Sequence, residues 1–417
     1  MTTSNNSENH HFESDPFPGK PRILFVGLSE NSHTHSWIDL LHDAPFNVRL
    51  FSMPSGVPPD DWSVRTYVTH YNAPPLNNKT RARLYPSNSL ARTTKRLTAQ
   101  ALGMPDLSAL AGRWLARVIK QWRPHVIHTL SIDHGGEFYF DVRQKFGLKG
   151  LGKWILTTRG GSDLTLPHLN PARRTQLMDI LASCDQIICD NQVDLNIARQ
   201  LGASEEQIAD IAPVPGTGGI DVDTLSRNWK GASSKRRVIV CTKAYDAPWV
   251  KILPAFEALK ICWDRIQPCE IHFLSMSPES QMWFWSLPED IRRSCHASER
   301  ISRAEVLELM TRARVMLAPA LTDGVPNSMY EAMAAGAFPI VSPLESIANV
   351  VKAEQNVLFA RNLYPNEIAE ALTRAMTDDG FVDSTAERNL ELVRRIADRN
   401  QIRRRVVDYY ERRSRDA

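Results

Sequence analysis

The stretch from Leu317 to Ser342 constrains the fold of this chain more than any other part of it. An apolar run over Val315–Leu321 predicts a buried strand, and the turn-forming segment Asp323–Asn327 follows it. A short helix is predicted from about Ser328 to Ala335, before a second buried strand that begins at Phe338. Strand, loop, helix and strand in this order are the repeating unit of a parallel sheet, so the chain is expected to be an α/β protein.

Two carboxylates flank the start of this helix. The helix begins where the first strand ends, so its free N–H groups point into the crevice in which parallel sheets bind anions. Glu331 lies one turn into the helix, eight residues after Asp323. Ser328–Glu331 also fits a capping box, in which the glutamate only bonds to the start of its own helix. On spacing alone, both interpretations of Glu331 stay open.

The segment resembles the donor-site signature of family 4 glycosyltransferases. That signature is an acidic residue, seven intervening residues and a glutamate, followed by Ala-Met-Ala-x-Gly, and here it runs from Asp323 to Gly336. The resemblance implies that Glu331 binds the nucleotide ribose and that Asp323, where Glu is commoner, contacts the transferred hexose. It assigns the intervening residues to the sugar and diphosphate, chiefly through backbone N–H groups. They are Gly324, Val325, Pro326, Asn327, Ser328 and Met329.

A chain of 417 residues exceeds what one hydrophobic core usually supports, so two domains are expected. The first residues are polar and lack the apolar core of a signal peptide, which indicates a disordered tail. A Gly-, Ala- and Ser-containing stretch after residue 228 indicates a linker. These signals predict a tail (1–20), an N-terminal domain (21–228), a linker (229–235), a C-terminal domain (236–385) and a final helix (386–417). The resemblance implies that the N-terminal domain binds the acceptor, that the C-terminal domain binds the nucleotide sugar, and that the final helix packs back on the N-terminal domain.

Composition limits the classes of partner. The net charge of +3 is too small to indicate nucleic-acid binding, and no apolar run approaches the roughly 20 residues that span a bilayer. The six cysteines are scattered and form no CxxC pair, as expected for buried thiols in a reduced, cytoplasmic protein. Basic residues cluster between Lys79 and Arg96 and between Arg394 and Arg415. One interpretation is that these clusters are solvated helix faces. The alternative is that they contact anionic lipid headgroups or a lipid-linked acceptor at the inner face of the membrane.

The first half of the chain repeats one pattern, in which a polar cluster follows each apolar run and precedes a helical pattern. This regularity predicts a doubly wound α/β domain. The expected strands are Arg22–Leu28, Asn47–Met53, Val64–Tyr71, Pro124–Leu130, Trp154–Thr158 and Gln186–Cys189, with a helix over Leu107–Gln121. The first strand is followed by an expected loop, Ser29–Ser36, which carries His33 and Thr34. Loops in this position carry function, and contact with an acceptor is favoured over a metal site.

The same half resembles the N-terminal domain of the family at three segments, namely Pro124–His128, Arg159–Asp163 and Pro215–Asp221. The resemblance implies a histidine on the transferred hexose, which we assign to His134, although Asp133 is an alternative. His128 lies within a predicted strand and is expected to be a core residue. The residues expected in the acceptor site or interdomain cleft are His33, Thr34, Arg159, Asp163, Gly218 and Gly219.

In the second half, Arg237–Thr242 predicts a strand that ends at Lys243, and a helix from about Trp249 carries Lys251 in its first turn. The resemblance implies that a basic pair at these points binds the donor diphosphate. Cationic side chains there offset the charge that grows on the leaving group. A solvated lysine is the alternative for Lys251.

Two other patterns have non-functional interpretations. Asp221-Val222-Asp223 has the spacing of a metal-binding Asp-x-Asp motif, but it lies in the Gly-Gly-Ile-Asp turn, where the resemblance implies no metal. Met282–Trp285 could stack on sugars or bases, and helix core was favoured instead.

Taken together, the residues and the resemblance predict a GT-B fold, with two Rossmann-like domains whose parallel sheets face a cleft. The implied activity is that of a retaining hexosyltransferase that needs no metal or other cofactor. Its donor would be a nucleotide-diphosphate sugar, and its acceptor a glycan, a lipid-linked molecule or a small molecule, as in polysaccharide biosynthesis. Two alternatives stay open, a nucleotide-sugar epimerase or hydrolase of the same fold, and a non-catalytic sugar-nucleotide-binding protein.

Overall fold

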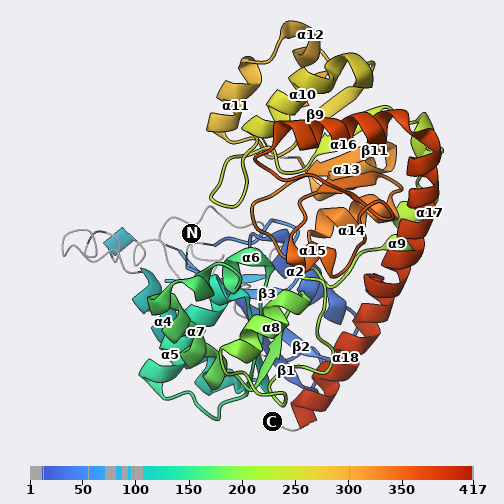
Figure 1. Cartoon of the computed structure of the whole chain (residues 1–417). Coiled ribbons are helices and arrows are strands. Elements are labelled where there is room, and N and C mark those ends of the chain that lie inside the picture. The colour runs from blue at the N-terminus through green and yellow to red at the C-terminus, as the bar shows by residue number, and fades with distance from the viewer. Residues whose placement is uncertain are drawn as a thin grey trace, which may run out of the picture. The chain divides into compact units, whose positions relative to one another are not determined.

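A computed structural model describes residues 12, 14–54, 56–70, 81–86, 93–94, 97, 107–299 and 301–415 (Figure 1). The chain forms two compact units. The first comprises Met1–Asp190, Asp194–Gly218 and Arg403–Ala417, and the second comprises Asn191–Val193 and Gly219–Ile402. The chain therefore passes from the first unit to the second at Gly218 and Gly219, ten residues before the expected boundary at 228.

The first unit is built on a sheet that has seven strands within the described residues, in the order β4-β3-β2-β1-β5-β6-β7. All of its strand pairs are parallel. The strands are β1 (Arg22–Gly27), β2 (Asn47–Ser52), β3 (Arg65–Thr69), β4 (Ala82–Tyr85), β5 (Val126–Leu130), β6 (Lys153–Thr157) and β7 (Gln186–Ile188). The predicted strands are confirmed to within a few residues, and β4 was not predicted.

The second unit holds a parallel sheet with the order β10-β9-β8-β11-β12-β13, again counted over the described part of the chain. The strands are β8 (Val238–Cys241), β9 (Glu270–Phe273), β10 (Cys295–Ala297), β11 (Ala313–Ala318), β12 (Phe338–Val341) and β13 (Leu358–Phe359). Apolar side chains cover both faces of this sheet and form two buried clusters, because a sheet with helices on both sides needs apolar residues on both faces. The predicted α/β class with two parallel sheets is confirmed.

Helices connect the strands, and Figure 1 shows α4, α5 and α7 side by side in the first unit. The helices of the first half are α2 (Ser32–Ile38), α4 (Leu107–Trp122), α5 (Glu137–Phe146), α6 (Gly160–Asp163), α7 (Pro171–Ser183), α8 (Gln192–Gln200) and α9 (Val222–Arg227). Those of the second half are α10 (Leu253–Ile266), α11 (Pro278–Trp285), α12 (Glu289–Arg292), α13 (Arg303–Arg312), α14 (Asn327–Ala334), α15 (Glu345–Ala348), α16 (Pro365–Thr377), α17 (Asp379–Ile396) and α18 (Arg399–Arg415). Short 3-10 turns lie at Asp39–Leu41, Pro167–Leu169 and Ser233–Lys235, and a π-helical segment, η2, lies at Ser131–Gly136.

The expected single final helix is two helices, α17 and α18. Ile220 causes the break, because its N–H donates to the carbonyl of Ala397 at 2.9 Å and its carbonyl accepts from the N–H of Arg399 at 2.9 Å. These bonds form a short parallel bridge between Ile220 and Asp398, and a backbone in a bridge cannot continue a helix.

The expected linker, residues 229–235, packs as part of the second unit. Trp229 donates from Nε1 to the carbonyl of Ala334 at 2.7 Å, and Ser233 donates from Oγ to the carbonyl of Gly336 at 2.5 Å. The sequence did not predict this packing, because small polar residues that are typical of flexible linkers also form hydrogen bonds to the end of a neighbouring helix.

Part of the expected tail also packs. Phe12 is buried, and Phe17 and Asn47 exchange hydrogen bonds in which Phe17 N donates to Asn47 Oδ1 at 2.9 Å. Asp15 accepts from Trp122 Nε1 at 2.9 Å. The predicted tail of residues 1–20 is therefore too long. The buried Phe12 and the carboxylate of Asp15 hold its last part on the first unit. Residues 1–11 and 13 lie outside the described residues.

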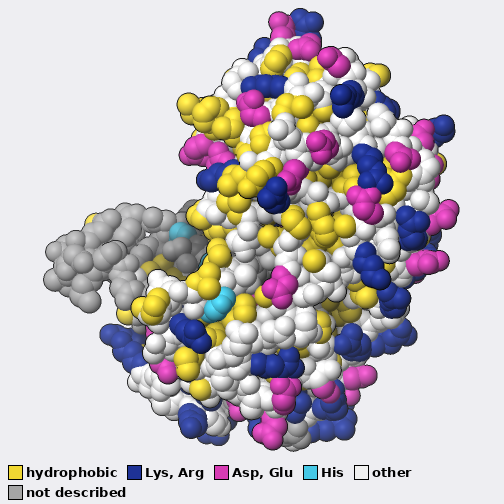
Figure 2. Space-filling view, in the orientation of Figure 1, with side chains coloured by type: hydrophobic (Ala, Val, Ile, Leu, Met, Phe, Trp, Pro, Cys, Tyr) yellow, Lys and Arg dark blue, Asp and Glu magenta, His cyan; other side chains and the backbone are white. Residues whose placement is uncertain are grey.

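Arginines of the second basic cluster hold α18 on the first unit. Arg405 Nη2 donates to the carbonyl of Ile211 at 2.6 Å, and Arg412 pairs with Asp210 at 2.6 Å. Figure 2 shows the Lys and Arg side chains in this region mixed with Asp and Glu. These contacts give the cluster a structural role. Of the first basic cluster, Lys79, Arg92, Lys95 and Arg96 lie outside the described residues.

Two other expectations can be compared with the structure. The helices in the described ranges are all too short or too polar to cross a bilayer. All six cysteines are free, and five of them are buried. The expected helix core at Met282–Trp285 is wrong for three of its residues, since Met282, Trp283 and Trp285 are exposed by 74%, 43% and 67%.

Gly218 and Gly219 adopt φ angles of +75° and +83° where the chain changes units. A Cβ atom on Gly219 would lie 2.6 Å from the carbonyl oxygen of Ala397, and one on Gly218 would lie 2.4 Å from Leu40 Cδ1. These contacts account for both glycines without a ligand.

We predict that Gly219→Ala destabilises the protein by about 2 to 4 kcal/mol, because backbone strain at positive φ adds to a steric clash. Gly231→Ala is the matched control, since Gly231 has the same φ of +83° and open space around it. Urea denaturation should give a loss of only about 1 to 2 kcal/mol for the control. Equal losses in the two variants would show that the clash at residue 219 is unimportant.

Candidate functional site

Each sheet has one point at which the strand order reverses. In the first sheet it lies between β1 and β5, and in the second between β8 and β11. Connections leave in opposite directions there, which opens a crevice at the carboxyl ends of the strands where α/β proteins bind ligands. The segments that follow these four strands are therefore the first places to look for function.

Lys243 and Asp323 meet at the reversal point of the second sheet. Lys243 follows β8 and Asp323 follows β11, and parallel pairing of Cys241 with Leu317 brings both segments to one edge. Lys243 Nζ forms an ion pair with Asp323 Oδ2, and the two side chains are 13% and 22% exposed. Ser346 Oγ donates to the carbonyl of Asp323 at 2.9 Å, which fixes the turn beside the pair.

Helix α14 begins directly after this turn. Pro326 is its N-cap and makes no side-chain cap hydrogen bond, and Met329 N donates to the Pro326 carbonyl at 3.0 Å. The side chains of Val325 and Met329 are buried in the core. Gly324 and Pro326 are also buried, whereas Asn327 and Ser328 are partly exposed. The helix start thus presents the positive end of its dipole and two polar side chains directly after the turn that holds Asp323.

Glu331 is the fifth residue of α14 and is only 5% exposed. Arg303, the first residue of α13, places Nη2 at 2.8 Å from Glu331 Oε1. Burial raises the pKa of Glu331, and Arg303 opposes that rise. The carboxylate is therefore held in the interior by one partly exposed arginine.

The alternative interpretation of Glu331 as part of a capping box is wrong. Helix α14 starts before Ser328, so Glu331 is not at the position that a capping box requires. A capping box does form nearby, where Ser302 Oγ accepts from Glu305 N at 3.2 Å and Glu305 Oε2 accepts from Ser302 N at 2.8 Å. That box orients the start of α13, and with it Arg303.

Lys251 lies just outside the helix in which it was expected. Helix α10 begins at Leu253, and the Lys251 side chain is exposed. Asn362 fixes the Lys251 backbone, since Oδ1 accepts from Lys251 N at 3.0 Å and Nδ2 donates to Lys251 O at 2.9 Å. Asn362 Nδ2 also donates to the carbonyl of Pro319 at 3.0 Å, which ties this loop to the end of β11. Lys251 and Asp323 therefore belong to loops at one end of the sheet.

Sequence reasoning missed Arg303, Ser346 and Asn362. A polar residue soon after a buried strand was the available signal for Ser346 and Asn362, which follow β12 and β13. Arg303 gave no such signal, because its role depends on a contact between two helices.

In the first unit, His33 and Thr34 lie in a helix rather than in the expected loop. Helix α2 begins at Ser32, because Asn31 Oδ1 accepts from His33 N at 2.8 Å and caps the helix. His33 is exposed near the helix start, whereas Thr34 is only 2% exposed. A buried Thr34 is therefore a packing residue, and His33 remains a candidate for ligand contact.

His134 and Asp133 lie in the π-helical segment η2, directly after β5. His134 is exposed, and its Nδ1 is 3.5 Å from Ser131 Oγ. Asp133 pairs with Arg173 at 3.1 Å, and Arg173 also pairs with Glu137. Burial, together with the neighbouring carboxylates, raises the pKa of Asp133 to about 6.

Asp163 and Arg159 follow β6. Asp163 is fully buried and accepts hydrogen bonds from Ser131 Oγ at 2.7 Å and from Arg159 N at 2.7 Å. It therefore joins the segments after β5 and β6. Arg159 has Nε and Nη2 buried without a hydrogen-bond partner, and burial lowers its pKa to about 10. An arginine with unused donors beside a strand end is well suited to an anionic ligand.

His128 is a core residue, as expected. It is fully buried, its Nε2 lies 2.6 Å from Thr157 Oγ1, and its Nδ1 contacts the hydroxyl of Tyr410 on α18. Burial lowers its pKa well below the ordinary value. Asp221, from the Asp-x-Asp pattern, is the N-cap of α9 and accepts from Thr224 N at 3.0 Å.

Among the described residues, one group has the spacing of metal ligands, namely Glu270, His272 and His296. It lies on β9 and β10, away from the reversal point of that sheet. Glu270 Oε1 lies 2.5 Å from His272 Nε2 and 3.5 Å from Arg312 Nη2. The carboxylate of Glu270 therefore already has a hydrogen-bond partner and a nearby cation, without a metal ion. Metal independence of the function stays a prediction.

Comparison with known proteins agrees with this geometry. Residues 236–378 match the sequence model of a family described as Glycosyl transferases group 1, and this range contains Lys243, Asp323 and Glu331. Anabaena HepE in complex with UDP-glucose superposes with a TM-score of 0.64 at 12% identity, over 94% of this chain and 99% of HepE. Sucrose-phosphate synthase from Thermosynechococcus elongatus gives a TM-score of 0.66 at 14% identity, over 95% of this chain and 100% of the synthase. The chain has the GT-B fold.

A third GT-B relative is the lipopolysaccharide outer core galactosyltransferase WaaB in its apo form, with a TM-score of 0.53 at 11% identity over 94% of this chain and 98% of WaaB. No curated protein matched the sequence significantly. The family match lies wholly within the second unit, whereas the structural likeness to GT-B proteins extends over both units.

We predict that Arg303→Ala destabilises the protein more at pH 8 than at pH 5. The variant leaves the buried Glu331 carboxylate without its ion-pair partner, at a cost of about 1 to 3 kcal/mol because Arg303 is itself partly exposed. The folded-state pKa of Glu331 is raised, so the cost is present above that pKa and is lost as the pH falls and the carboxyl takes up a proton.

Thermal unfolding at the two pH values measures this difference. Arg312→Ala is the control, because Arg312 lies at the other end of α13 and pairs with a different carboxylate, that of the partly exposed Glu270, at 3.5 Å. An Arg303→Ala loss that does not change with pH would contradict the ion pair.

We also predict that Asp133→Asn changes the pH dependence of stability. Because its folded-state pKa is about 6, above the ordinary value for Asp, the folded state binds an extra proton below that pH, and stability falls as pH rises towards 6. The wild-type protein should therefore lose more stability than Asp133→Asn between pH 5 and pH 7.5. Parallel curves for the two proteins would show that Asp133 titrates normally.

Proposed function

We propose that this protein is a glycosyltransferase that moves a hexosyl group from a nucleotide-diphosphate sugar to an acceptor, with retention of anomeric configuration and without a metal ion. The observation that carries the proposal is the meeting of Lys243, Asp323 and the start of α14 at the reversal point of the second sheet, within the residues that match the glycosyltransferase family. The HepE structures with UDP and UDP-glucose support a nucleotide-sugar donor.

The proposed donor site combines cations and backbone donors for a diphosphate. Lys243 and the positive end of α14 would bind the phosphates, and Lys251 would add a mobile cation from the neighbouring loop. Negative charge grows on the diphosphate as the bond to the sugar breaks, so these groups stabilise the transition state more than the ground state. They would do the work that a divalent cation does in metal-dependent transferases.

Two carboxylates would orient the rest of the donor. Glu331 would accept hydrogen bonds from the ribose hydroxyls, which take the place of Arg303 on Oε1. Asp323 would accept a hydrogen bond from a hydroxyl of the hexose while it remains paired with Lys243. A buried, already charged acceptor makes such bonds strong, because water does not compete for it.

In the proposed step, the bond from the anomeric carbon to the diphosphate oxygen breaks, and an acceptor oxygen bonds to the same face of that carbon. The acceptor proton passes to the departing phosphate. Retaining glycosidases use a closely spaced pair of carboxyl groups, one of them as the nucleophile. The proposed site assigns Asp323 to sugar binding instead, so the leaving phosphate serves as the base.

The first unit would contribute contacts to the acceptor and the hexose. His134 and His33 are exposed at the ends of β5 and β1, the two strands at the reversal point of this sheet. Arg159 offers unused donors, whereas Asp163 acts indirectly by fixing the Arg159 backbone.

The test starts with donor binding. UDP-, GDP- and ADP-sugars are screened for thermal stabilisation, since a ligand of the folded state raises its melting temperature. Glu331→Gln should weaken binding of the stabilising donor by roughly 10- to 100-fold through loss of a charged hydrogen bond. Asp323→Asn should lower turnover at saturating donor by roughly 100-fold. Asp221→Asn, which changes only a helix cap, is the control.

The reaction products then distinguish a transferase from a hydrolase, an epimerase and a non-catalytic binding protein. A transferase releases nucleoside diphosphate faster when a panel of glycan and lipid-linked acceptors is present, and EDTA leaves the rate unchanged. Release without any response to acceptor would indicate a hydrolase, and donor isomerisation would indicate an epimerase. Tight donor binding without turnover would indicate a binding protein. Each of these three results would contradict the proposal.

A further inference from the structure

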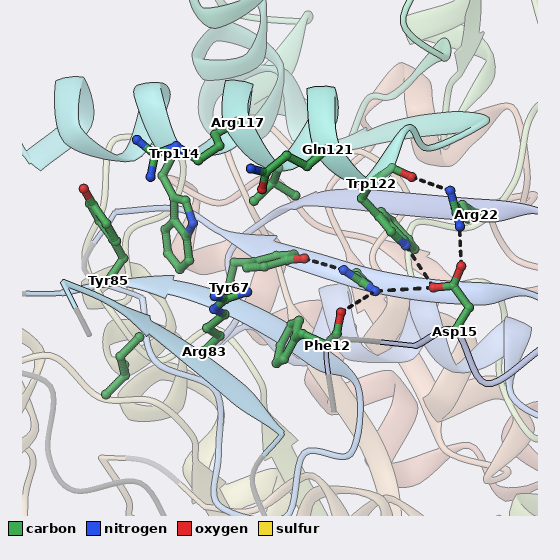
Figure 3. A pocket seen from close by; sticks show the side chains of 13 residues that line it. Phe12, Asp15, Arg22, Tyr67, Arg83, Tyr85, Trp114, Arg117, Gln121 and Trp122 are labelled. Atoms are coloured by element: carbon green, nitrogen blue, oxygen red, sulfur yellow. Dashed lines mark hydrogen bonds and ion pairs between the residues drawn. The ribbon is translucent and has the colours of Figure 1, made fainter. Parts of the chain in front are cut away.

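The first unit contains a cavity of about 540 Å3 between α4 and the edge strands of its sheet (Figure 3). Binding sites for small molecules have volumes of about 300 to 1,000 Å3. Figure 3 shows Trp114, Gln121 and Trp122 of α4 opposite Tyr67 and Arg83 of the strands. Parallel pairing of Tyr67 with Arg83 puts both side chains on the face that α4 covers.

This cavity is separate from the candidate functional site. Arg22, the first residue of β1, and Trp122, the last residue of α4, both line it. The site residues of this unit instead follow the last residues of β1, β5 and β6. The cavity also lies against β3 and β4, which β2 separates from the strands at the reversal point, so its occupant would not be the donor.

The charges around the cavity are strongly unequal. Four arginines line it, namely Arg22, Arg49, Arg83 and Arg117, against one carboxylate, Asp15. Asp15 pairs with Arg22 at 2.6 Å and with Arg49 at 3.3 Å. One carboxylate is thus shared by two cations, and the lining keeps a net positive charge that favours an anion.

Arg49 is built into the wall of the cavity. It is only 5% exposed, its Nη1 donates to the hydroxyl of Tyr67 at 2.6 Å, and its guanidinium lies 4.2 Å from the centre of the Trp122 ring. Its Nε is buried and has no hydrogen-bond partner. A buried cation in a fixed position provides a lasting positive potential, because water does not screen it.

Arg83 and Arg117 supply the accessible cations. Both side chains are exposed, and neither makes an ion pair within the part of the chain that the structure describes. Burial and the neighbouring cations Arg49 and Arg81 lower the pKa of Arg65, on the adjoining strand, which agrees with a positive potential along this edge. Arginine binds phosphate through two parallel hydrogen bonds, so two unpaired arginines suit a phosphate group.

Aromatic rings lie beside these arginines. The rings of Tyr85 and Trp114 are stacked, with centroids 5.0 Å apart and an interplanar angle of 29°. Tyr85 is partly exposed, and both residues line the cavity. An aromatic ring beside an arginine can pack against a ring of the ligand while the arginine binds a phosphate. This arrangement therefore suits a ligand in which a phosphate is attached to a ring.

We propose that this cavity binds a small phosphate ester of a sugar, with its phosphate on Arg83 and its ring against Tyr85, while Arg117 adds positive charge on the α4 side of the cavity (Figure 3). Arg49 and Arg22 would stabilise the phosphate through the potential they create rather than by direct contact. The proposal does not depend on the proposed glycosyl transfer, because it uses a different part of the first unit.

The test uses the full chain and glucose 6-phosphate as the probe, with glucose and inorganic phosphate as comparisons. Isothermal titration calorimetry should show glucose 6-phosphate binding with a Kd below about 1 mM, inorganic phosphate binding more weakly, and no binding of glucose. Arg83→Ala should weaken glucose 6-phosphate binding roughly tenfold, and Arg117→Ala should weaken it by a smaller factor. Neither change should alter folding, since both side chains are exposed and make no ion pair among the described residues.

Lys120→Ala is the matched control, because Lys120 is an exposed cation of the same helix that does not line the cavity. Its affinity should equal that of the wild-type protein. The proposal is overturned if glucose 6-phosphate does not bind, if Arg83→Ala and Arg117→Ala bind it normally, or if Lys120→Ala loses as much affinity. Nucleotide-sugar binding, measured on the same variants, should stay unchanged, so failure here is distinguishable from failure of the proposed function.

Discussion

Parallel pairing of β8 with β11 is the constraint on which the candidate donor site depends. The pairing puts the ends of both strands at one edge, so that a lysine and an aspartate 80 residues apart form an ion pair. Because the strand order reverses here, the next segments diverge and leave the pair partly open to solvent. Helix α14 starts beside it, with its dipole adding positive charge to that of Lys243. The same arrangement would bind a diphosphate and stabilise it as a leaving group.

The sequence was sufficient for the architecture. The helix α4 begins at Leu107 and the strand β12 at Phe338, as predicted, because helical periodicity and continuous apolar runs are local signals. Strands β4 and β10 were missed, since both are short and carry exposed polar residues at sheet edges. Ser328–Glu331 and Ser302–Glu305 fit the same capping-box pattern, but only the second forms one. The difference arises because α14 starts before Ser328, and Glu331 pairs with Arg303 instead, a contact that no local pattern contains.

The arrangement of polar groups in the first unit follows from burial. Asp163 is completely buried, so its carboxylate accepts hydrogen bonds from backbone and hydroxyl groups of the protein and does not contact a ligand. It joins the loops after β5 and β6, and so positions Arg159, whose donors remain unused. The cavity beneath α4 shows the same principle at another place, where the buried Arg49 creates a potential and exposed arginines are available for contact. In both cases a buried charge fixes the position of the polar groups around it.

A crystal structure of the protein soaked with UDP tests the central claim most directly, since it locates the diphosphate without any assumption about acceptor or sugar. The account predicts density for the phosphates at the N-terminus of α14 within hydrogen-bond distance of Lys243, and the ribose hydroxyls on Glu331 with Arg303 displaced. Phosphate density elsewhere on the second unit, or a Glu331 that keeps its contact with Arg303 while UDP is bound, would contradict it.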